Sequence, residues 1–161
     1  MKYLIIYYSR TGNTKKVASY IAQRMGCDIE EIVDMKVRRG LIGYLIGGKD
    51  AATKKLTEIK ELQKDLSAYD AVIIGTPVWA FTMTPAIRTY LHNNKEKFRN
   101  VAFFCTEIGT GGKKTFTHME AVCGKKPKSV LEITEKEVKK DTYMQKVQEF
   151  IERIIESMQR S

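Results

Sequence analysis

The feature that most constrains the fold is an apolar run, a hydroxyl-rich turn and a helical pattern placed consecutively at the start of the chain. Residues 3–8 are all aliphatic or aromatic, which is typical of a strand buried on both faces. The turn that follows reads Ser9-Arg10-Thr11-Gly12-Asn13-Thr14. After it, apolar residues recur at helical spacing, at Val17, Ala18, Ile21, Ala22 and Met25. We therefore predict a buried strand that feeds directly into the N-terminus of a helix.

That turn is suited to a phosphate group. A helix N-terminus presents backbone N–H groups and the positive end of the helix dipole. Ser9, Thr11 and Thr14 add hydroxyl donors, and Gly12 permits a close approach or a positive φ. The segment has neither the G-x-x-x-x-G-K pattern of a P-loop nor the G-x-G-x-x-G pattern of a dinucleotide fold. We predict a site for one terminal phosphate, with a helix-capping turn that binds no ligand as the alternative.

The rest of the chain alternates between strand-like and helix-like stretches. Further strands are expected at 27–33, 71–75, 101–105 and 129–133, and helices at 85–94, 113–123 and 141–158. The strands that start at residues 3, 71 and 101 are continuously apolar, as interior strands are, whereas the other two carry charges, as edge strands can. The predicted fold class is α/β. We expect a doubly wound, five-stranded parallel sheet in the flavodoxin-like order 2-1-3-4-5, with helices on both faces and one domain over residues 1–161.

Composition excludes several other classes of protein. The chain is 43% hydrophobic and 29% charged, which is ordinary for a globular domain, and we expect neither a signal peptide nor a membrane span. Cys27, Cys105 and Cys123 suggest no disulfide framework and no zinc site, so a cytoplasmic location is expected. The net charge of +9 comes from scattered basic residues without a recognition motif, which favours a solvated basic surface over nucleic-acid binding. His92 and His118 have no neighbouring ligand set, so no metal site is predicted.

Three loops should meet where the strands end. In a sheet of this kind ligands bind beyond the carboxyl ends of the strands, near the point where the strand order reverses. The loops 9–14, 76–84 and 106–112 converge there and are rich in hydroxyls, glycines or aromatics. Trp79 could supply an aromatic wall for a planar ligand, with packing in the core as the alternative.

These loops are where the chain resembles flavodoxin and related FMN-binding domains. The similarity runs from the opening strand and Ser-Arg-Thr-Gly-Asn-Thr, through Gly75-Thr76-Pro77-Val78-Trp79, to the closing helix. It implies FMN as the cofactor, whose phosphate would be held by Ser9, Thr11, Gly12, Asn13 and Thr14, with Arg10 beside it. The second loop would lie against the isoalloxazine through Thr76, Pro77, Val78, Trp79, Ala80 and Phe81. The third would flank the pyrimidine side, mostly through the backbone, with Thr106, Glu107, Gly109, Thr110, Gly111 and Gly112.

The chain also departs from that family in three ways. Residues 76–84 contain no glycine, so positive φ should be less accessible and the flavin semiquinone less stabilised. The third loop lacks the tyrosine that often covers the outer flavin face, so we expect Phe81, Tyr44 or an exposed ring edge in its place. The chain is basic where many flavodoxins are acidic. Positive charge near the phosphate end should favour the reduced, anionic flavin and a redox partner with an acidic or neutral docking surface.

Residues 34–57 are the least determined part of the sequence. Leu41, Ile42, Tyr44, Leu45 and Ile46 stand among glycines at positions 40, 43, 47 and 48. We expect a short helix and a loop packed on the sheet, because four glycines weaken any helix that has to stand alone. The alternatives are a mobile flap over the flavin, a surface for a partner, or an interfacial contact with a membrane.

The leading functional hypothesis is a cytoplasmic electron-transfer flavoprotein that shuttles electrons between redox partner proteins. The flavin would perform the chemistry, so no catalytic side chain is predicted, and neither nucleic acid nor integral membrane association is expected. The runner-up is an FMN-dependent NAD(P)H or quinone oxidoreductase on the same fold. A third hypothesis is a binding module that keeps the fold without the flavin.

Overall fold

The sheet has the predicted strand order. The structure, a computed structural model, describes residues 1–38 and 40–160. Its strands are β1 (Tyr3–Tyr7), β2 (Asp28–Glu31), β3 (Ala71–Pro77), β4 (Val101–Glu107) and β5 (Val130–Thr134). They pair in parallel in the order β2-β1-β3-β4-β5, which confirms the flavodoxin-like fold class. The apolar strands β1, β3 and β4 are interior and almost wholly buried, whereas the charged β2 and β5 form the edges.

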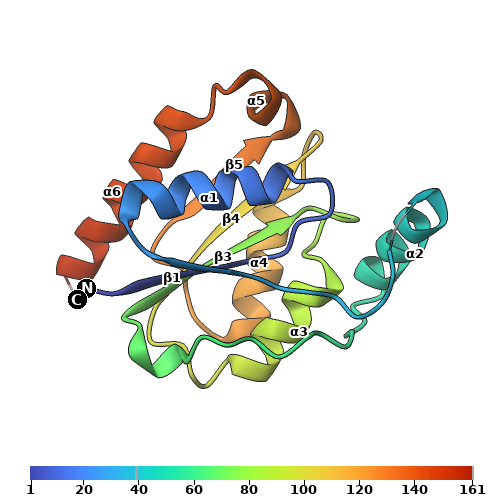
Figure 1. Cartoon of the computed structure of the whole chain (residues 1–161), viewed down its shortest axis with the longest axis horizontal. Coiled ribbons are helices and arrows are strands. Elements are labelled where there is room, and N and C mark those ends of the chain that lie inside the picture. The colour runs from blue at the N-terminus through green and yellow to red at the C-terminus, as the bar shows by residue number, and fades with distance from the viewer. Residues whose placement is uncertain (39, 161) are drawn as a thin grey trace.

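Helices cover both faces of the sheet (Figure 1). One face carries α1 (Asn13–Met25), α5 (Glu135–Lys140) and α6 (Met144–Gln159), and the other carries α3 (Pro85–Asn94) and α4 (Gly112–Cys123). Because strand side chains alternate between faces, Phe104 packs with α1 and α6, whereas Phe103 packs with α3 and α4. The two layers therefore bury separate apolar clusters on opposite sides of the same strands.

The helix predicted over 141–158 is present as α6, which begins at Met144. The short helix α5 that precedes it is not predicted from the sequence, and it ends where Asp141 adopts a left-handed conformation with φ of 53°. A capping box between Thr134 and Glu137 starts α5 directly after β5. A 3₁₀ turn, η1 (Leu66–Ala68), precedes β3. Helix α5 matters for the site because its first residue, Glu135, lies at the edge of the sheet where the strands end.

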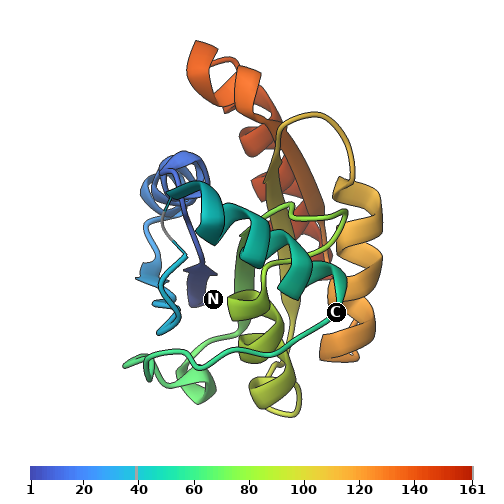
Figure 2. The same ribbon diagram turned by 90° about the vertical axis from the view of Figure 1, so that its right-hand side faces the viewer.

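The segment 34–57 contains helix α2 (Gly40–Ala52), so the prediction of a short helix is confirmed. Its predicted packing on the sheet is wrong. Figures 1 and 2 show α2 beyond the carboxyl ends of the strands, standing apart from the two helical layers. No helix in the described part of the chain is long and apolar enough to cross a membrane.

Candidate functional site

A cavity of about 390 Å³ lies at the carboxyl ends of β1, β3 and β4, between the start of α1 and α2. This volume falls within the range of roughly 300–1,000 Å³ that is usual for small-molecule sites. The three predicted loops meet there. The lining residues are Arg10, Thr11, Asn13, Thr14, Tyr44, Leu45, Gly48, Lys49, Pro77, Val78, Trp79, Ala80, Thr106, Glu107, Ile108 and Glu135.

The first loop wraps around the start of α1. Ser9 Oγ accepts hydrogen bonds from the backbone N–H groups of Gly12 and Lys15, both at 3.2 Å. Gly12 has a φ of 95°, a conformation that glycine adopts without strain. Ser9 and Gly12 therefore shape the loop and do not line the cavity, whereas Thr11, Asn13 and Thr14 do.

Two side-chain bonds tie this loop to neighbouring elements. The Thr14 and Thr106 hydroxyls are 2.7 Å apart in a buried contact that links α1 to the end of β4. Asn13 Nδ2 donates to Glu135 Oε1 at 3.3 Å, at the start of α5. Glu135 is not among the predicted site residues, because its approach depends on helix α5 starting directly after β5. It places one carboxylate beside the hydroxyl-rich end of the cavity.

The second loop forms a tight turn at Trp79–Thr82. The backbone groups of Trp79 and Thr82 bond reciprocally at 2.9 and 3.0 Å, and Ala80 and Phe81 between them have φ of 49° and 59°. Two consecutive positive φ angles are typical of a type I′ turn. The expectation that a glycine-free loop avoids positive φ is therefore wrong, and the semiquinone prediction loses its premise.

The predicted residues of this second loop divide into two groups. Pro77, Val78, Trp79 and Ala80 line the cavity. Thr76 is buried beneath the loop, where its hydroxyl donates to the Pro77 carbonyl at 2.9 Å. Phe81 lies outside the cavity and is half exposed.

Trp79 joins the sheet to α2. Its ring meets Tyr8 edge-on, with centroids 5.7 Å apart. On the α2 side, a Cβ atom added to Gly47 would lie 2.8 Å from Trp79 Cζ3, so the indole packs closely on the helix backbone. Trp79 is thus a fixed wall of the cavity, partly buried against the core.

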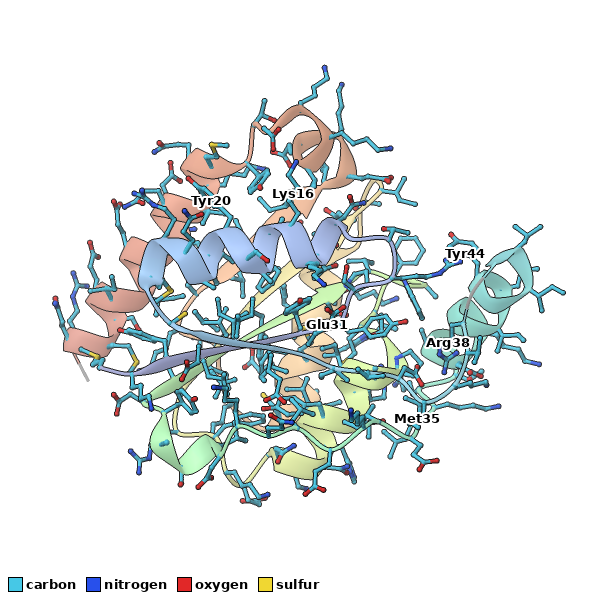
Figure 3. All side chains as sticks on the ribbon, in the orientation of Figure 1. Lys16, Tyr20, Glu31, Met35, Arg38 and Tyr44 are labelled. Carbon is cyan, nitrogen blue, oxygen red and sulfur yellow. The ribbon has the colours of Figure 1, made fainter. Side chains whose placement is uncertain are left out.

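Helix α2 supplies the opposite wall through Tyr44, Leu45, Gly48 and Lys49. Arg10 reaches from the first loop, donates to the Gly40 carbonyl at 3.0 Å, and stands 5.0 Å over the Tyr44 ring. Figure 3 shows Tyr44 between α2 and the loop that precedes α1. Of the predicted replacements for the missing tyrosine, Tyr44 therefore lines the cavity and Phe81 does not.

A buried ion network anchors α2. Arg38 donates to Asp34 at 2.7 Å and to Asp50 at 2.8 Å, and Lys36 also donates to Asp50 at 2.7 Å. The hydrogen bond from Lys36, followed by that from Arg38, lowers the pKa of the Asp50 carboxyl. Gly43 lies against this network, because a Cβ there would lie within 2.3 Å of the Arg38 backbone. The helix is therefore placed by Arg38, by the Arg10 bond to Gly40 and by glycines that allow a close approach.

The third loop contributes three residues to the cavity lining. Thr106, Glu107 and Ile108 line it, whereas Gly109, Thr110, Gly111 and Gly112 do not. Glu107 is buried, and its Oε2 accepts from the Gly112 N–H at 3.0 Å. Burial raises the pKa of the Glu107 carboxyl, and the neighbouring Glu132 adds to this rise. Glu107 therefore holds the start of α4 in place.

Two basic side chains, Arg88 and His118, lie behind the Trp79–Thr82 turn. Arg88 donates to Thr82 Oγ1 at 3.0 Å, and His118 Nδ1 is 2.8 Å from the same oxygen. Burial, followed by the positive charge of Arg88, lowers the pKa of His118. Thr82 thus connects the turn to both helices on its face of the sheet.

Taken together, the cavity combines two recognition chemistries. Hydroxyls, an amide and a helix N-terminus stand at one end, and they suit a phosphate. Trp79 and Tyr44 stand on the walls, and they suit a planar ring. Such an arrangement can bind a flat heterocycle that carries a single phosphate.

Comparison with known proteins agrees with this geometry. Residues 1–124 match the model of the family described as NADPH-dependent FMN reductase. A flavoprotein from Lactobacillus acidophilus, solved in complex with FMN, is 29% identical, with a TM-score of 0.73 over 86% of this chain and 97% of its own. A search of curated proteins found no match.

More distant structures share the fold alone. A flavodoxin, WrbA-like protein from Agrobacterium tumefaciens is 12% identical, with a TM-score of 0.60 over 99% of both chains. General stress protein 14 from Treponema denticola, solved with FMN, is 14% identical, with a TM-score of 0.56 over 98% of this chain and 99% of its own.

Proposed function

The chain belongs to the NADPH-dependent FMN reductase family, and we propose that it is an FMN-dependent oxidoreductase that passes electrons from NAD(P)H to a small planar acceptor such as a quinone. Membership of the family confirms the predicted cofactor, FMN. It supports the reductase, which was the alternative reading of the sequence, better than the electron carrier that was the leading one.

The residues present fit FMN, and the observation that carries the proposal is the pairing of the two recognition chemistries in one cavity. Thr11, Asn13, Thr14 and the N-terminus of α1 would hold the phosphate. Trp79 and Tyr44 would pack against the ring system. Glu135 lies at the same end as the phosphate donors, where it orients Asn13 through the 3.3 Å hydrogen bond.

The mouth of the cavity supports a reaction with a second small molecule. Tyr44, Leu45 and Ile108 line the cavity and still expose 49%, 64% and 79% of their surface, so apolar side chains surround its opening. When bound, FMN supplies two-electron chemistry, with the net reaction NAD(P)H + H⁺ + quinone → NAD(P)⁺ + hydroquinone. The chain's own residues would position the cofactor and present an apolar rim to the acceptor.

The first test is whether purified protein retains FMN and then oxidises NADPH with a water-soluble quinone. We expect retention, and turnover that needs both substrates. Thr11→Ala should weaken FMN binding about tenfold or more, because it removes a hydrogen bond to a charged group. Thr117→Ala, the same change at an exposed position of α4, should leave binding unchanged.

The result separates the candidate functions. FMN retention with no NADPH oxidation, but with reduction by a separate reductase protein, would favour the electron carrier. Failure to retain FMN would leave only the binding module. A protein partner with an acidic or neutral docking surface stays a prediction in either case.

A further inference from the structure

Helix α2 leaves its large apolar side chains exposed. Its buried positions include Gly43, Gly47 and Ala51, whereas Leu41, Ile42 and Leu45 are 78%, 74% and 64% exposed. A helix that served only as a cavity wall would carry polar residues on its outward face. In α2 the usual arrangement of a surface helix, apolar inside and polar outside, is reversed. Its inward face carries glycines because a side chain there would collide with Arg38 or Trp79. The outward face is therefore an apolar surface that the rest of the described chain does not cover.

The segment that carries this surface is rich in positive charge. Residues 34–57 contain six Lys or Arg and only two acidic residues, Asp34 and Asp50. Both carboxylates are at least 94% buried and bonded to Arg38, and Asp50 also pairs with Lys36, so they neutralise part of this charge from beneath the surface. Lys36, Lys49, Lys54 and Lys55 are exposed. Within the described residues of 34–57, the exposed charges are all positive.

We propose that the outward face of α2 binds the surface of an anionic lipid bilayer. An apolar strip flanked by lysines is what an interfacial helix needs, since the aliphatic side chains enter the acyl boundary while the lysines contact acidic headgroups. Leu41, Ile42 and Leu45 form the strip in the first half of α2, and the exposed Lys49 and Lys54 follow it in the chain, near and beyond the end of the helix.

Charge and apolar character argue against the other occupants of this surface. A second copy would bring two lysine-rich segments face to face, which like-charge repulsion opposes. Transient complexes between redox proteins bury a small interface area. A strip of projecting aliphatic side chains is more apolar surface than such an interface needs to bury. A bilayer satisfies both the apolar strip and its positive border.

This placement would also select the acceptor, an extension that rests on the proposed function. Tyr44 and Leu45 line the cavity from the same helix, so a bilayer against α2 lies beside the cavity mouth. A lipophilic quinone dissolved in that bilayer would reach the mouth without crossing water. The proposed acceptor class is therefore a membrane-soluble quinone.

The test is sedimentation of FMN-saturated protein with phosphatidylcholine vesicles that contain or lack phosphatidylglycerol, without NADPH. We expect binding only to the anionic vesicles. Ile42→Glu, which is outside the cavity lining, should weaken binding about tenfold or more, because it removes a buried aliphatic group and adds a negative charge. Met144→Glu on α6 makes a similar change on another element and should bind like the parent.

The electrostatic part has its own matched pair of variants. Lys54→Gln with Lys55→Gln should weaken binding about fivefold for each lysine and reduce its salt dependence. Lys125→Gln with Lys126→Gln, beyond the far end of α4, should have little effect. Equal losses in both pairs would assign the binding to overall charge and overturn the proposal.

Further outcomes separate this proposal from the proposed function. Absence of binding to anionic vesicles, or a dimer in ultracentrifugation that Ile42→Glu dissociates, would overturn the membrane surface. Vesicle binding without NADPH oxidation would support the surface while refuting the reductase. NADPH oxidation with a soluble quinone but no vesicle binding would do the reverse.

Discussion

The loop 9–14 and helix α2 face each other across the cavity, yet they are held in place differently. The loop continues from the interior strand β1 and is pinned by the Thr14–Thr106 hydrogen bond. Helix α2 lies outside both helical layers and is held by the Arg38 network and by glycine contacts. One wall of the cavity thus belongs to the cooperative core, whereas the other depends on a few side chains.

This difference indicates that the two walls have different local stabilities. Regions with few buried apolar contacts open at a lower free-energy cost than the core. The loop should therefore open only with global unfolding, while α2 can detach alone. Hydrogen exchange of the α2 amides, compared with that of the β1 amides, measures this separation.

Arg38→Met should release α2 selectively. It leaves the buried Asp34 and Asp50 without their shared cation, which costs about 3–5 kcal/mol where such a pair is broken. Amides of α2 should lose most of their protection while those of β1 and β3 keep theirs. Arg99→Met removes an exposed arginine with a 3.9 Å contact to Asp70 and should cost under about 1 kcal/mol. Equal loss of protection in β1 would show that the two walls form one unit.

Thr14→Val should act on the other wall and on the whole fold. It leaves the buried Thr106 hydroxyl without its partner, at a cost of about 1–3 kcal/mol in urea unfolding. The double variant with Thr106→Val should recover part of this loss, because no hydroxyl is then left unpaired. A double variant that loses the sum of the two single changes would contradict the assignment.

Two adjacent glycines in α2 should respond in opposite directions. At Gly48 a new Cβ meets nothing within 4 Å, so Gly48→Ala should stabilise α2 by about 1 kcal/mol through helix propensity. At Gly47 the same methyl would lie 2.8 Å from Trp79, so Gly47→Ala should destabilise α2. Only Gly47→Ala should change the fluorescence of Trp79, which is the chain's single tryptophan. Identical effects of both changes would refute the close contact.

The smallest expected effect is a pH dependence at the turn behind Trp79. The pKa of His118 is lowered, so the folded state binds fewer protons than the unfolded state between the folded value and about 6.5. Stability should rise with pH across that interval and fall as the pH drops through it. Titration of His118 by NMR would locate the interval, and His118→Gln should flatten this part of the stability curve. A pKa at or above 6.5 would contradict the inferred burial.

Much of the cavity wall formed by the loops could be predicted, because the sequence patterns that specify it span only a few residues. Strand and helix periods report which face of each element is buried, so β1, β3 and β4 could be assigned to the interior from their apolar runs. Parallel topology then brings the loops 9–14, 76–84 and 106–112 to one edge. For the same reason Thr11, Trp79 and Thr106 could be placed together from the sequence, and all three line the cavity.

The α2 side could not be predicted, because its signals are contacts between distant residues. The glycines of α2 read as helix weakeners in sequence, and only the packing of Gly43 on Arg38 and Gly47 on Trp79 explains them. Positive φ at Ala80 and Phe81 is imposed by closure of the turn, which residue propensities oppose.

The sequence by itself therefore determined which strands are interior and which are edges, and the hydroxyl-rich turn that follows the first strand, because backbone periodicity and turn chemistry act over a few residues. Tertiary structure alone decided that α2 closes the cavity, that Glu135 reaches Asn13, and that Leu41 and Ile42 face outward. Those outcomes depend on close approach, buried charge pairing and helix breaks, which exist only once the chain is packed.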